Sequence, residues 1–150
     1  VVHSNRMYSL ENGYNSEEVV EWYNRILKST GLSHVELVCE LKYDGASISL
    51  EYLDGVFQRA ITRGDGFQGD DVSENIRTIK TVPLKLHSQH FKGFSVFRGE
   101  VILPIDGFNK LNEIQESKGL PLYANPRNTA SGTLKLQDST EVAKRPLECL

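Results

Sequence analysis

The chain has 150 residues, of which 39% are hydrophobic and 25% are charged, which is enough to bury one sizeable core in a single globular unit. Its formal net charge of −3 excludes indiscriminate attachment to nucleic acid, which needs clustered lysines and arginines, so any such contact has to be local. The chain has only two cysteines, Cys39 and Cys149, which lie far apart in the sequence, so neither a zinc site nor a disulfide framework is indicated. It shows neither a signal peptide nor an apolar run of membrane length, and we expect a protein of the reducing cytoplasm.

Residues 1–31 predict an irregular segment followed by one helix. The apolar residues of the irregular segment, which we expect to dock onto a core, are Met7, Tyr8 and Leu10. Asn15 and Glu18 have the spacing of a capping box, which predicts the start of the helix, and Gly31 is expected to end it. The apolar stripe between these ends consists of Val19, Trp22, Tyr23, Ile26 and Leu27.

Residues 35–63 predict a three-stranded antiparallel meander. Polar and apolar side chains alternate in residues 35–42, VELVCELK, so Glu40 and Lys42 are expected to share one face of a strand. The side chains expected to face the core are Leu37, Cys39 and Leu41. Asp-Gly pairs at positions 44–45 and 54–55 supply the turn chemistry for two hairpins. Lys42 and the neighbouring acids are therefore expected to lie close together at the first hairpin.

The remaining sequence alternates short helical and strand patterns, so we expect an α+β fold with antiparallel sheets and flanking helices. The expected elements are a short helix over residues 71–79, a strand over 82–86, a strand over 94–103, a helix from Pro104 to near Gly119, a loop with a short helix over 125–136, and a strand beginning at residue 145. Phe108, Leu111 and Ile114 are expected to face inward from the helix after Pro104.

Lys42-Tyr43-Asp44-Gly45 is the motif that carries the most chemical information. A lysine held at the end of a strand can act as a nucleophile. Taken alone the motif decides little, because most such lysines are solvated charges and most Asp-Gly pairs are only turns. Three further features follow it in order: a glycine-rich acidic loop over residues 62–71, Glu100 in an otherwise apolar strand, and the sequence ANPRN over residues 124–128.

Together with HSNRMYSL over residues 3–10 and KRP over residues 144–146, these motifs span nearly the whole chain. They closely resemble the adenylation domain of bacterial NAD-dependent DNA ligases, which belong to the lysine nucleotidyltransferase superfamily. The resemblance implies an ATP-grasp-like nucleotidyltransferase core. It also implies that residues 1–150 are a partial adenylation domain, incomplete at the C-terminal side, with no second domain. The family's nicotinamide-capturing, OB-fold, zinc-finger, helix-hairpin-helix and BRCT modules are expected to lie outside the chain, and zinc with them.

The reaction implied by the resemblance begins with attack of Lys42 on the α-phosphate of NAD. An adenylyl-lysine forms, and nicotinamide mononucleotide leaves. The full enzyme then passes AMP to the 5′-phosphate of a nick in double-stranded DNA and seals the strand, in replication and repair. The expected cofactors are NAD and Mg²⁺ or Mn²⁺, and the expected setting is a monomer in the bacterial cytoplasm. We expect the isolated fragment to be inactive or weakly active.

The resemblance also implies roles for individual residues. Glu40 matches the acid that contacts the adenine amino group, and Ser9 and Leu10 match the pair that lines the same base. Arg63 matches the arginine that holds ribose and phosphate, a role suited to its planar fork of donors. Glu100 matches the acid that meets the ribose hydroxyl. No metal ligand is assigned.

Basic residues of the C-terminal third are the candidates for contact with the nicked duplex. The resemblance implies such a role for Arg127, Lys135 and Arg145. Contacts of this kind position a duplex without reading its sequence, so nick recognition is expected to be sequence-independent. Ordinary surface ion pairs are the alternative, for example between Arg63 and Asp65.

The expected chemistry requires that the Lys42 amine lose its proton before it attacks. Glu40, Asp44 and Glu100 nearby oppose that loss, because negative charge stabilises the ammonium form. A magnesium ion that arrives with the pyrophosphate neutralises these acids, so we expect a metal-dependent reaction and a partly buried lysine.

Two other functions stay open from the residues. An ATP-dependent ligase or a capping-type nucleotidyltransferase shares Lys-x-Asp-Gly, although the details of residues 62–71 and 125–128 favour the NAD class. A non-catalytic binding module is the second alternative, with Arg63-Gly64-Asp65 as an adhesion tripeptide. Three-residue matches are frequent by chance, and no secretion signal accompanies this one.

Overall fold

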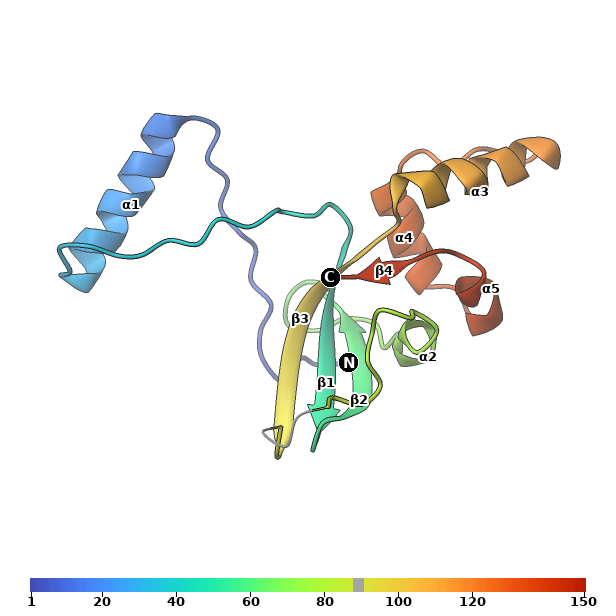
Figure 1. The fold of residues 1–150 in the computed structure, drawn as a ribbon, viewed down its shortest axis with the longest axis horizontal. Helices are drawn as coiled ribbons and strands as arrows, with labels where there is room; N and C mark the ends of the chain where they lie inside the picture. The colour runs from blue at the N-terminus through green and yellow to red at the C-terminus, as the bar shows by residue number, and fades with distance from the viewer. Residues whose placement is uncertain (88–90) are drawn as a thin grey trace. The chain divides into compact units, whose positions relative to one another are not determined.

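The computed structural model describes residues 1–87 and 91–150, which form helices and an antiparallel sheet (Figure 1). The elements in chain order are α1 (Ser16–Thr30), β1 (Ala46–Leu53), β2 (Val56–Thr62), α2 (Ser73–Ile76), β3 (Phe94–Ile102), α3 (Ile105–Ser117), α4 (Pro126–Leu134), α5 (Ser139–Ala143) and β4 (Glu148–Cys149). The chain divides into two compact units. We call Val1–Met7 with Tyr43–Leu150 the sheet unit, and Tyr8–Lys42 the helix unit.

The sheet has the order β2-β1-β3-β4, with every neighbouring pair antiparallel. A mixed fold with an antiparallel sheet and flanking helices was the expectation, and the structure confirms it. The turn between β1 and β2 has Asp54 at φ 49° and Gly55 at φ 75°, as a tight hairpin turn with two left-handed central residues requires. The second predicted Asp-Gly hairpin is therefore confirmed, and β1 lies in the centre of the sheet with both edges paired.

Strand β1 is buried on both faces, and the two faces differ in chemistry. Ile48 and Tyr52 point into the apolar core, which the sheet shares with residues of α2, α4 and α5, such as Ile76, Leu134 and Val142. The opposite face carries polar side chains, of which Ser49 and Glu51 are nearly inaccessible to solvent. We call this second side the polar face of the sheet.

Residues 1–7 cover part of the polar face. Ser4 donates a hydrogen bond to Glu51, whose carboxylate also receives two from Arg59. Arg98 of β3 donates to the backbone carbonyls of Asn5 and Arg6. These contacts fix the N-terminal segment over the strands and explain the burial of Met7, which was expected to dock onto the core. Tyr8 and Leu10 belong to the helix unit and are exposed, so the same expectation is wrong for them.

The predicted strand over residues 35–42 is wrong, because residues 34–44 have no regular secondary structure. Leu37, Cys39 and Leu41 are exposed rather than in a core. A strand needs a neighbour for its backbone groups. Both edges of β1 are already taken by β2 and β3, so this sheet offers no place beside β1 for another strand. The first predicted hairpin is therefore also wrong: Gly45 leads directly into β1.

The helix unit contains α1, which begins and ends where the sequence predicts. The Asn15 side chain accepts a hydrogen bond from the Glu18 amide at 2.9 Å, and Gly31 closes the helix at φ 71°. However, no residue of α1 is buried. The predicted apolar stripe therefore has no tight packing partner in the described part of the chain.

The later elements follow the prediction with local differences. Residues 82–86 make only one isolated bridge, between Lys85 and Val56, and Pro83 lacks the amide that a strand would use, so the predicted strand there is wrong. Phe108 and Leu111 pack against the core as expected, whereas Ile114 is exposed. Helix α5 was not expected; Asp138 begins it by accepting from the Thr140 amide. None of the helices in the described ranges is both long and apolar enough to span a bilayer.

Candidate functional site

The residues singled out from the sequence fall into two groups that the fold treats differently. Ser9, Leu10, Glu40 and Lys42 belong to the helix unit, and all are exposed. The second group, in the sheet unit, consists of Arg63, Glu100, Arg127, Lys135 and Arg145. The second group is held by strands, a capped helix and several hydrogen bonds. Two of its members, Arg63 and Glu100, define a candidate site on the polar face.

A row of three residues crosses the sheet at the end where β1 begins. Arg63 follows the last residue of β2, and its amide donates to the Ser47 carbonyl at 3.2 Å. Ser47 of β1 is paired directly with Glu100 of β3. Since side chains of directly paired residues point to the same side of a sheet, Ser47 and Glu100 share the polar face.

The Glu100 carboxylate is fixed by two donors at the start of β1. The Gly45 amide donates to Oε1 at 3.1 Å, and the Ser47 hydroxyl donates to Oε2 at 2.6 Å. The Arg98 guanidinium on the same strand donates to the backbone carbonyls of Asn5 and Arg6. Burial raises the pKa of the neighbouring Cys149 thiol to about 11, and the negative charge of Glu100 contributes to this.

Ser47 and Gly45 were not assigned a role from the sequence. Gly45 permits a close approach of β1 and β3, since a Cβ at this position would lie 2.2 Å from the Val101 carbonyl oxygen. The sequence signal for Ser47 was its place two residues after Gly45, but only the strand register shows that it lies opposite Glu100.

The glycine-rich loop after β2 is held together by hydrogen bonds between its own residues, including the backbone of Arg63. The Asp65 carboxylate accepts from the amides of Gln68 and Phe67, at 2.8 and 2.9 Å, and these bonds lower its pKa. Gly64 lies at φ 56°, and a Cβ there would lie 1.9 Å from the Gln68 carbonyl oxygen. The loop conformation therefore needs this glycine and an acceptor oxygen on the side chain of Asp65, two residues from Arg63.

His3 holds the same loop from the N-terminal segment. Its ring is buried, and Nε2 lies 3.1 Å from the Arg63 carbonyl oxygen. A carbonyl only accepts, so Nε2 is the protonated nitrogen. The backbone of His3 and that of Met7 also bond to Phe67 and Gly66. Residues 3–7, the part of the HSNRMYSL motif that belongs to the sheet unit, thus hold this loop in place.

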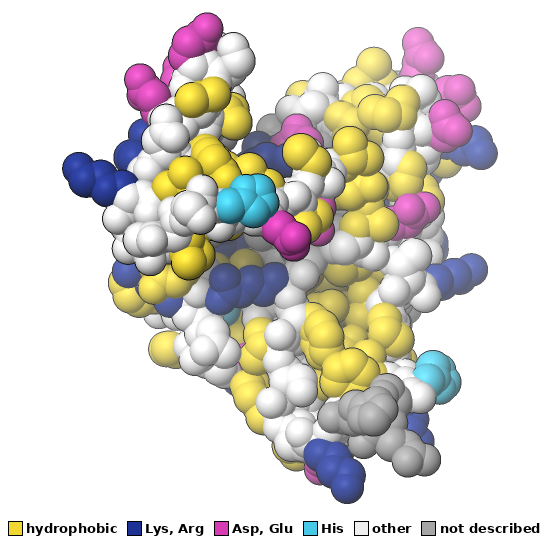
Figure 2. Space-filling model, turned by 60° about the vertical axis from the view of Figure 1, so that its left-hand side comes forward, with side chains coloured by type: hydrophobic (Ala, Val, Ile, Leu, Met, Phe, Trp, Pro, Cys, Tyr) yellow, Lys and Arg dark blue, Asp and Glu magenta, His cyan; other side chains and the backbone are white. Residues whose placement is uncertain are grey.

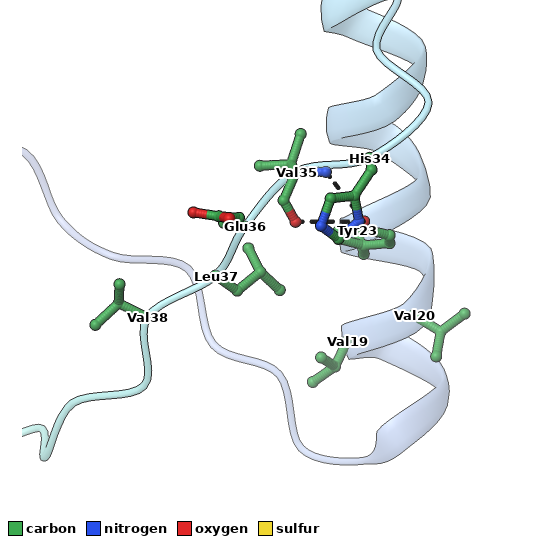
Figure 3. A pocket seen from close by; sticks show the side chains of 8 residues that line it. All are labelled: Val19, Val20, Tyr23, His34, Val35, Glu36, Leu37 and Val38. Carbon is green, nitrogen blue, oxygen red and sulfur yellow. Dashed lines mark hydrogen bonds between the residues drawn. The ribbon is translucent and has the colours of Figure 1, made fainter.

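The segment that contains Lys42 differs from the expectation. A partly buried lysine was expected, and Lys42 is exposed, because residues 34–44 form no strand that could enclose it. The helix unit does contain a pocket of about 650 Å³, between α1 and residues 34–38 (Figure 3). Tyr23 anchors it through hydrogen bonds of its hydroxyl with the backbone of Val35, at 3.2 and 3.4 Å. Neither Glu40 nor Lys42 lines this pocket.

Many large apolar side chains of the chain are exposed, and hydrophobic groups are visible on the face drawn in Figure 2. In the helix unit they include Val20, Leu37 and Val38. Figure 2 also shows lysine and arginine side chains scattered among them rather than gathered in one field.

The three candidate DNA-contact residues lie on or next to α4. Arg127 and Lys135 are exposed and form ion pairs with Asp44 at 3.1 Å and with Asp70 at 2.8 Å. The hydrogen bond from Lys135, and then its charge, lowers the pKa of Asp70. Arg145 is half-buried; it donates to the Thr133 hydroxyl at 2.7 Å and lies over the ring of Tyr123.

The described residues include no group of three or more histidine, cysteine, aspartate and glutamate side chains arranged to hold a metal ion. Mg²⁺ commonly binds through substrate phosphates with one or two carboxylates and several waters.

The whole sequence is similar to a known protein family and to several known proteins. Residues 1–150 match the family model described as NAD-dependent DNA ligase adenylation domain. The chain is 61% identical over its full length to a protein named DNA ligase from Christiangramia forsetii, covering 22% of that protein. It is 59% identical over 99% of its length to a DNA ligase from Flavobacterium psychrophilum, again covering 22%. The chain is also 51% identical over 94% of its length to a DNA ligase from Petrotoga mobilis, covering 21% of that protein. The chain thus spans about a fifth of the length of these curated relatives.

Proposed function

The chain belongs to the NAD-dependent DNA ligase adenylation domain family, and from this premise we propose that it carries the lysine that accepts AMP from NAD. Lys42 attacks the α-phosphate, forms an adenylyl-lysine and releases nicotinamide mononucleotide. The observation that carries the proposal is the family match over all of residues 1–150, including Lys42-Tyr43-Asp44-Gly45.

The proposed nucleotide-binding residues are those of the two groups described above. Arg63 holds ribose and phosphate, and Glu100 meets the ribose hydroxyl. Glu40, Ser9 and Leu10 contact the adenine base. Hydrogen bonds fix the Glu100 carboxylate and the loop that contains Arg63. This supports the proposal, since a site binds its ligand in a more defined geometry when its groups are already oriented.

We assign the overall architecture in the same way. Residues 1–150 are part of one adenylation domain with an ATP-grasp-like nucleotidyltransferase core, and they hold no second domain. The match of one family model over both compact units supports a single domain.

In the whole protein, the adenylate passes to the 5′-phosphate of a nick, and the strand is sealed during replication and repair in the bacterial cytoplasm. The protein acts as a monomer. Arg127 and Lys135, which are exposed and paired only with exposed acids, are the favoured phosphate contacts. Arg145 contributes chiefly by supporting α4, since its guanidinium is engaged by Thr133 and Tyr123.

The reaction is proposed to depend on Mg²⁺ or Mn²⁺. Such an ion would be held through oxygens of the nucleotide phosphates with few protein groups, and it would neutralise charge on the phosphates. The residues of the chain then bind and orient the nucleotide and supply the nucleophile.

Intact-mass measurement of the full-length protein tests the proposal. After incubation with NAD and Mg²⁺, we expect a covalent adenylyl adduct that is absent in Lys42→Ala and retained in Lys118→Ala, a control at another exposed lysine. Chelation of the divalent ion should abolish the adduct. An adduct from ATP but not from NAD would indicate an ATP-dependent ligase or a capping-type enzyme. No adduct from either nucleotide would indicate a non-catalytic module.

A further inference from the structure

We propose that Ser47 is a positioning residue for the nucleotide site: its hydroxyl orients the Glu100 carboxylate toward a hydroxyl of the adenosine ribose. This inference rests on the proposed function, because it takes Glu100 as the group that meets the ribose. It adds a residue that the sequence did not single out and a role that can be separated from the role of Lys42.

The distance between the two side chains carries the first step. Ser47 Oγ lies 2.6 Å from Glu100 Oε2, within the range of short, charge-assisted O–H···O⁻ bonds. Both residues are half-buried, which limits competition from water. Their direct pairing between β1 and β3 places them on one face, so the bond needs no distortion of either strand.

The second step concerns the hydrogen-bond acceptor sites that remain free on the Glu100 carboxylate. An ionised carboxylate has about four acceptor sites on its two oxygens. The Gly45 amide occupies one on Oε1, and the Ser47 hydroxyl occupies one on Oε2. Each oxygen therefore keeps acceptor capacity, and a sugar hydroxyl is a donor of the right kind to use it.

The third step is the effect of removing one of the two donors. With Gly45 alone, the carboxylate is tethered through a single oxygen and can rotate about that bond. Glutamate side chains lose much rotational freedom when they are fixed, and binding the ribose must then supply that cost. Ser47 lowers the cost by fixing Glu100 before the nucleotide arrives.

Neighbouring residues on the same face provide a matched control. Ser49 lies two residues further along β1, on the polar face, and is nearly fully buried. It is paired with Arg98 and Ile61 rather than with Glu100. Ser49→Ala therefore makes the same chemical change in the same strand without touching the proposed contact.

The experiment measures the rate of lysine adenylation in the full-length protein with NAD and with NAD analogues whose adenosine ribose lacks the 2′- or the 3′-hydroxyl. For Ser47→Ala we expect kcat/KM for NAD to fall by roughly 10- to 100-fold, mainly through KM, as for a lost hydrogen bond to a charged group. For the analogue that lacks the hydroxyl met by Glu100, the same substitution should change the rate less than 3-fold. Ser47→Thr, which keeps a hydroxyl, should recover most of the activity, and Ser49→Ala should leave the rate with NAD unchanged.

Glu100→Gln provides a second readout. If Ser47 acts through Glu100, adding Ser47→Ala to Glu100→Gln should cost much less than it does in the wild-type protein. Equal losses with NAD and with both analogues, or full additivity with Glu100→Gln, would show that Ser47 is only structural. An unchanged rate in Ser47→Ala overturns the inference too.

Failure of this inference can be told apart from failure of the proposed function. The wild-type protein and Lys42→Ala are measured first. An adduct that depends on Lys42, together with an inert Ser47, removes only the positioning role. Absence of any adduct with NAD removes the function on which that role rests.

Discussion

Strand β1 and residues 34–42 have similar sequence patterns and different structures. Both alternate polar and apolar side chains, as in ASISLEYL and VELVCELK. In β1 both edges are hydrogen-bonded and both faces are covered, whereas residues 34–42 have no strand partner within the described ranges. The difference shows that alternation gives a segment the capacity to form a strand, and that an available edge decides whether it does.

The same difference separates the residues that the sequence singled out. Arg63 and Glu100 are placed by strand register, a hydrogen-bonded loop and hydrogen bonds to the Glu100 carboxylate. Glu40 and Lys42 belong to a segment without ladder pairing, where no such contacts fix the side chains. Substitutions in the two regions should consequently have very different effects on stability.

Hydrogen exchange gives the largest expected contrast. We expect backbone amides of residues 36–42 to exchange at close to unprotected rates, while those of Leu50 and Tyr52 are slower by a factor of roughly 1,000 or more, since core strands open only with large-scale unfolding. Mass spectrometry of deuterated peptides from the two segments measures this. Strong protection at residues 36–42 would contradict the comparison.

Of two truncations to alanine, Ile48→Ala should destabilise the protein much more than Val38→Ala. Ile48 is fully buried in the core, so we expect a loss of about 2 to 5 kcal/mol in the free energy of unfolding. Val38→Ala, in the unpaired segment, removes an exposed side chain and should change it by less than about 0.5 kcal/mol. Urea denaturation of both variants measures the difference; similar losses would mean that Val38 packs in solution.

Gly45→Ala tests the close approach of β1 and β3. The new methyl group meets a backbone oxygen, so we expect a loss of about 1 to 3 kcal/mol in stability together with disturbance of the Glu100 carboxylate. Gly132→Ala is the control: it lies in α4 with nothing within 4 Å of the added Cβ, and it should stabilise by about 0.5 to 1 kcal/mol. We expect the melting temperature of Gly45→Ala to lie below that of Gly132→Ala. Equal melting temperatures would argue against a tight β1–β3 contact.

Asp65→Asn should have the smallest effect, a loss of stability that is present near neutral pH and disappears in acid. Amide donors hold the folded-state pKa of Asp65 below its ordinary value of 3.8. Its contribution to stability is therefore complete above that value and is lost as the pH falls below it, through the folded-state pKa. Asparagine keeps an acceptor oxygen but does not titrate. Denaturation curves between about pH 5 and pH 2 should show a shallower decline for the variant, and parallel curves would rule this linkage out.

Local sequence chemistry predicted a large part of the fold. The Asn15 cap, the Gly31 stop, the Asp54-Gly55 hairpin and the strand around Glu100 all appear where the sequence indicated them. These features depend on neighbours a few residues apart, so the sequence contains the information needed. Helix α5 was missed because its signal is a single short cap at Asp138.

Errors arose where distant segments decide the outcome. The unpaired residues 34–44 and the exposed Ile114 could not be foreseen, because edge availability and helix orientation depend on the assembled sheet. For the candidate site, the sequence singled out Arg63 and Glu100, but it gave no indication that Ser47 lies between them across the strands.

The sequence by itself determined the family, the lysine motif and the local turns and caps, because these reside in residue identity and short spacing. Only the tertiary structure decided which side chains share the polar face, how Ser47 and Gly45 hold Glu100, and how His3 straps the Arg63 loop. The physical reason is that such contacts join residues more than 50 positions apart, and only the assembled fold brings these residues within hydrogen-bonding distance.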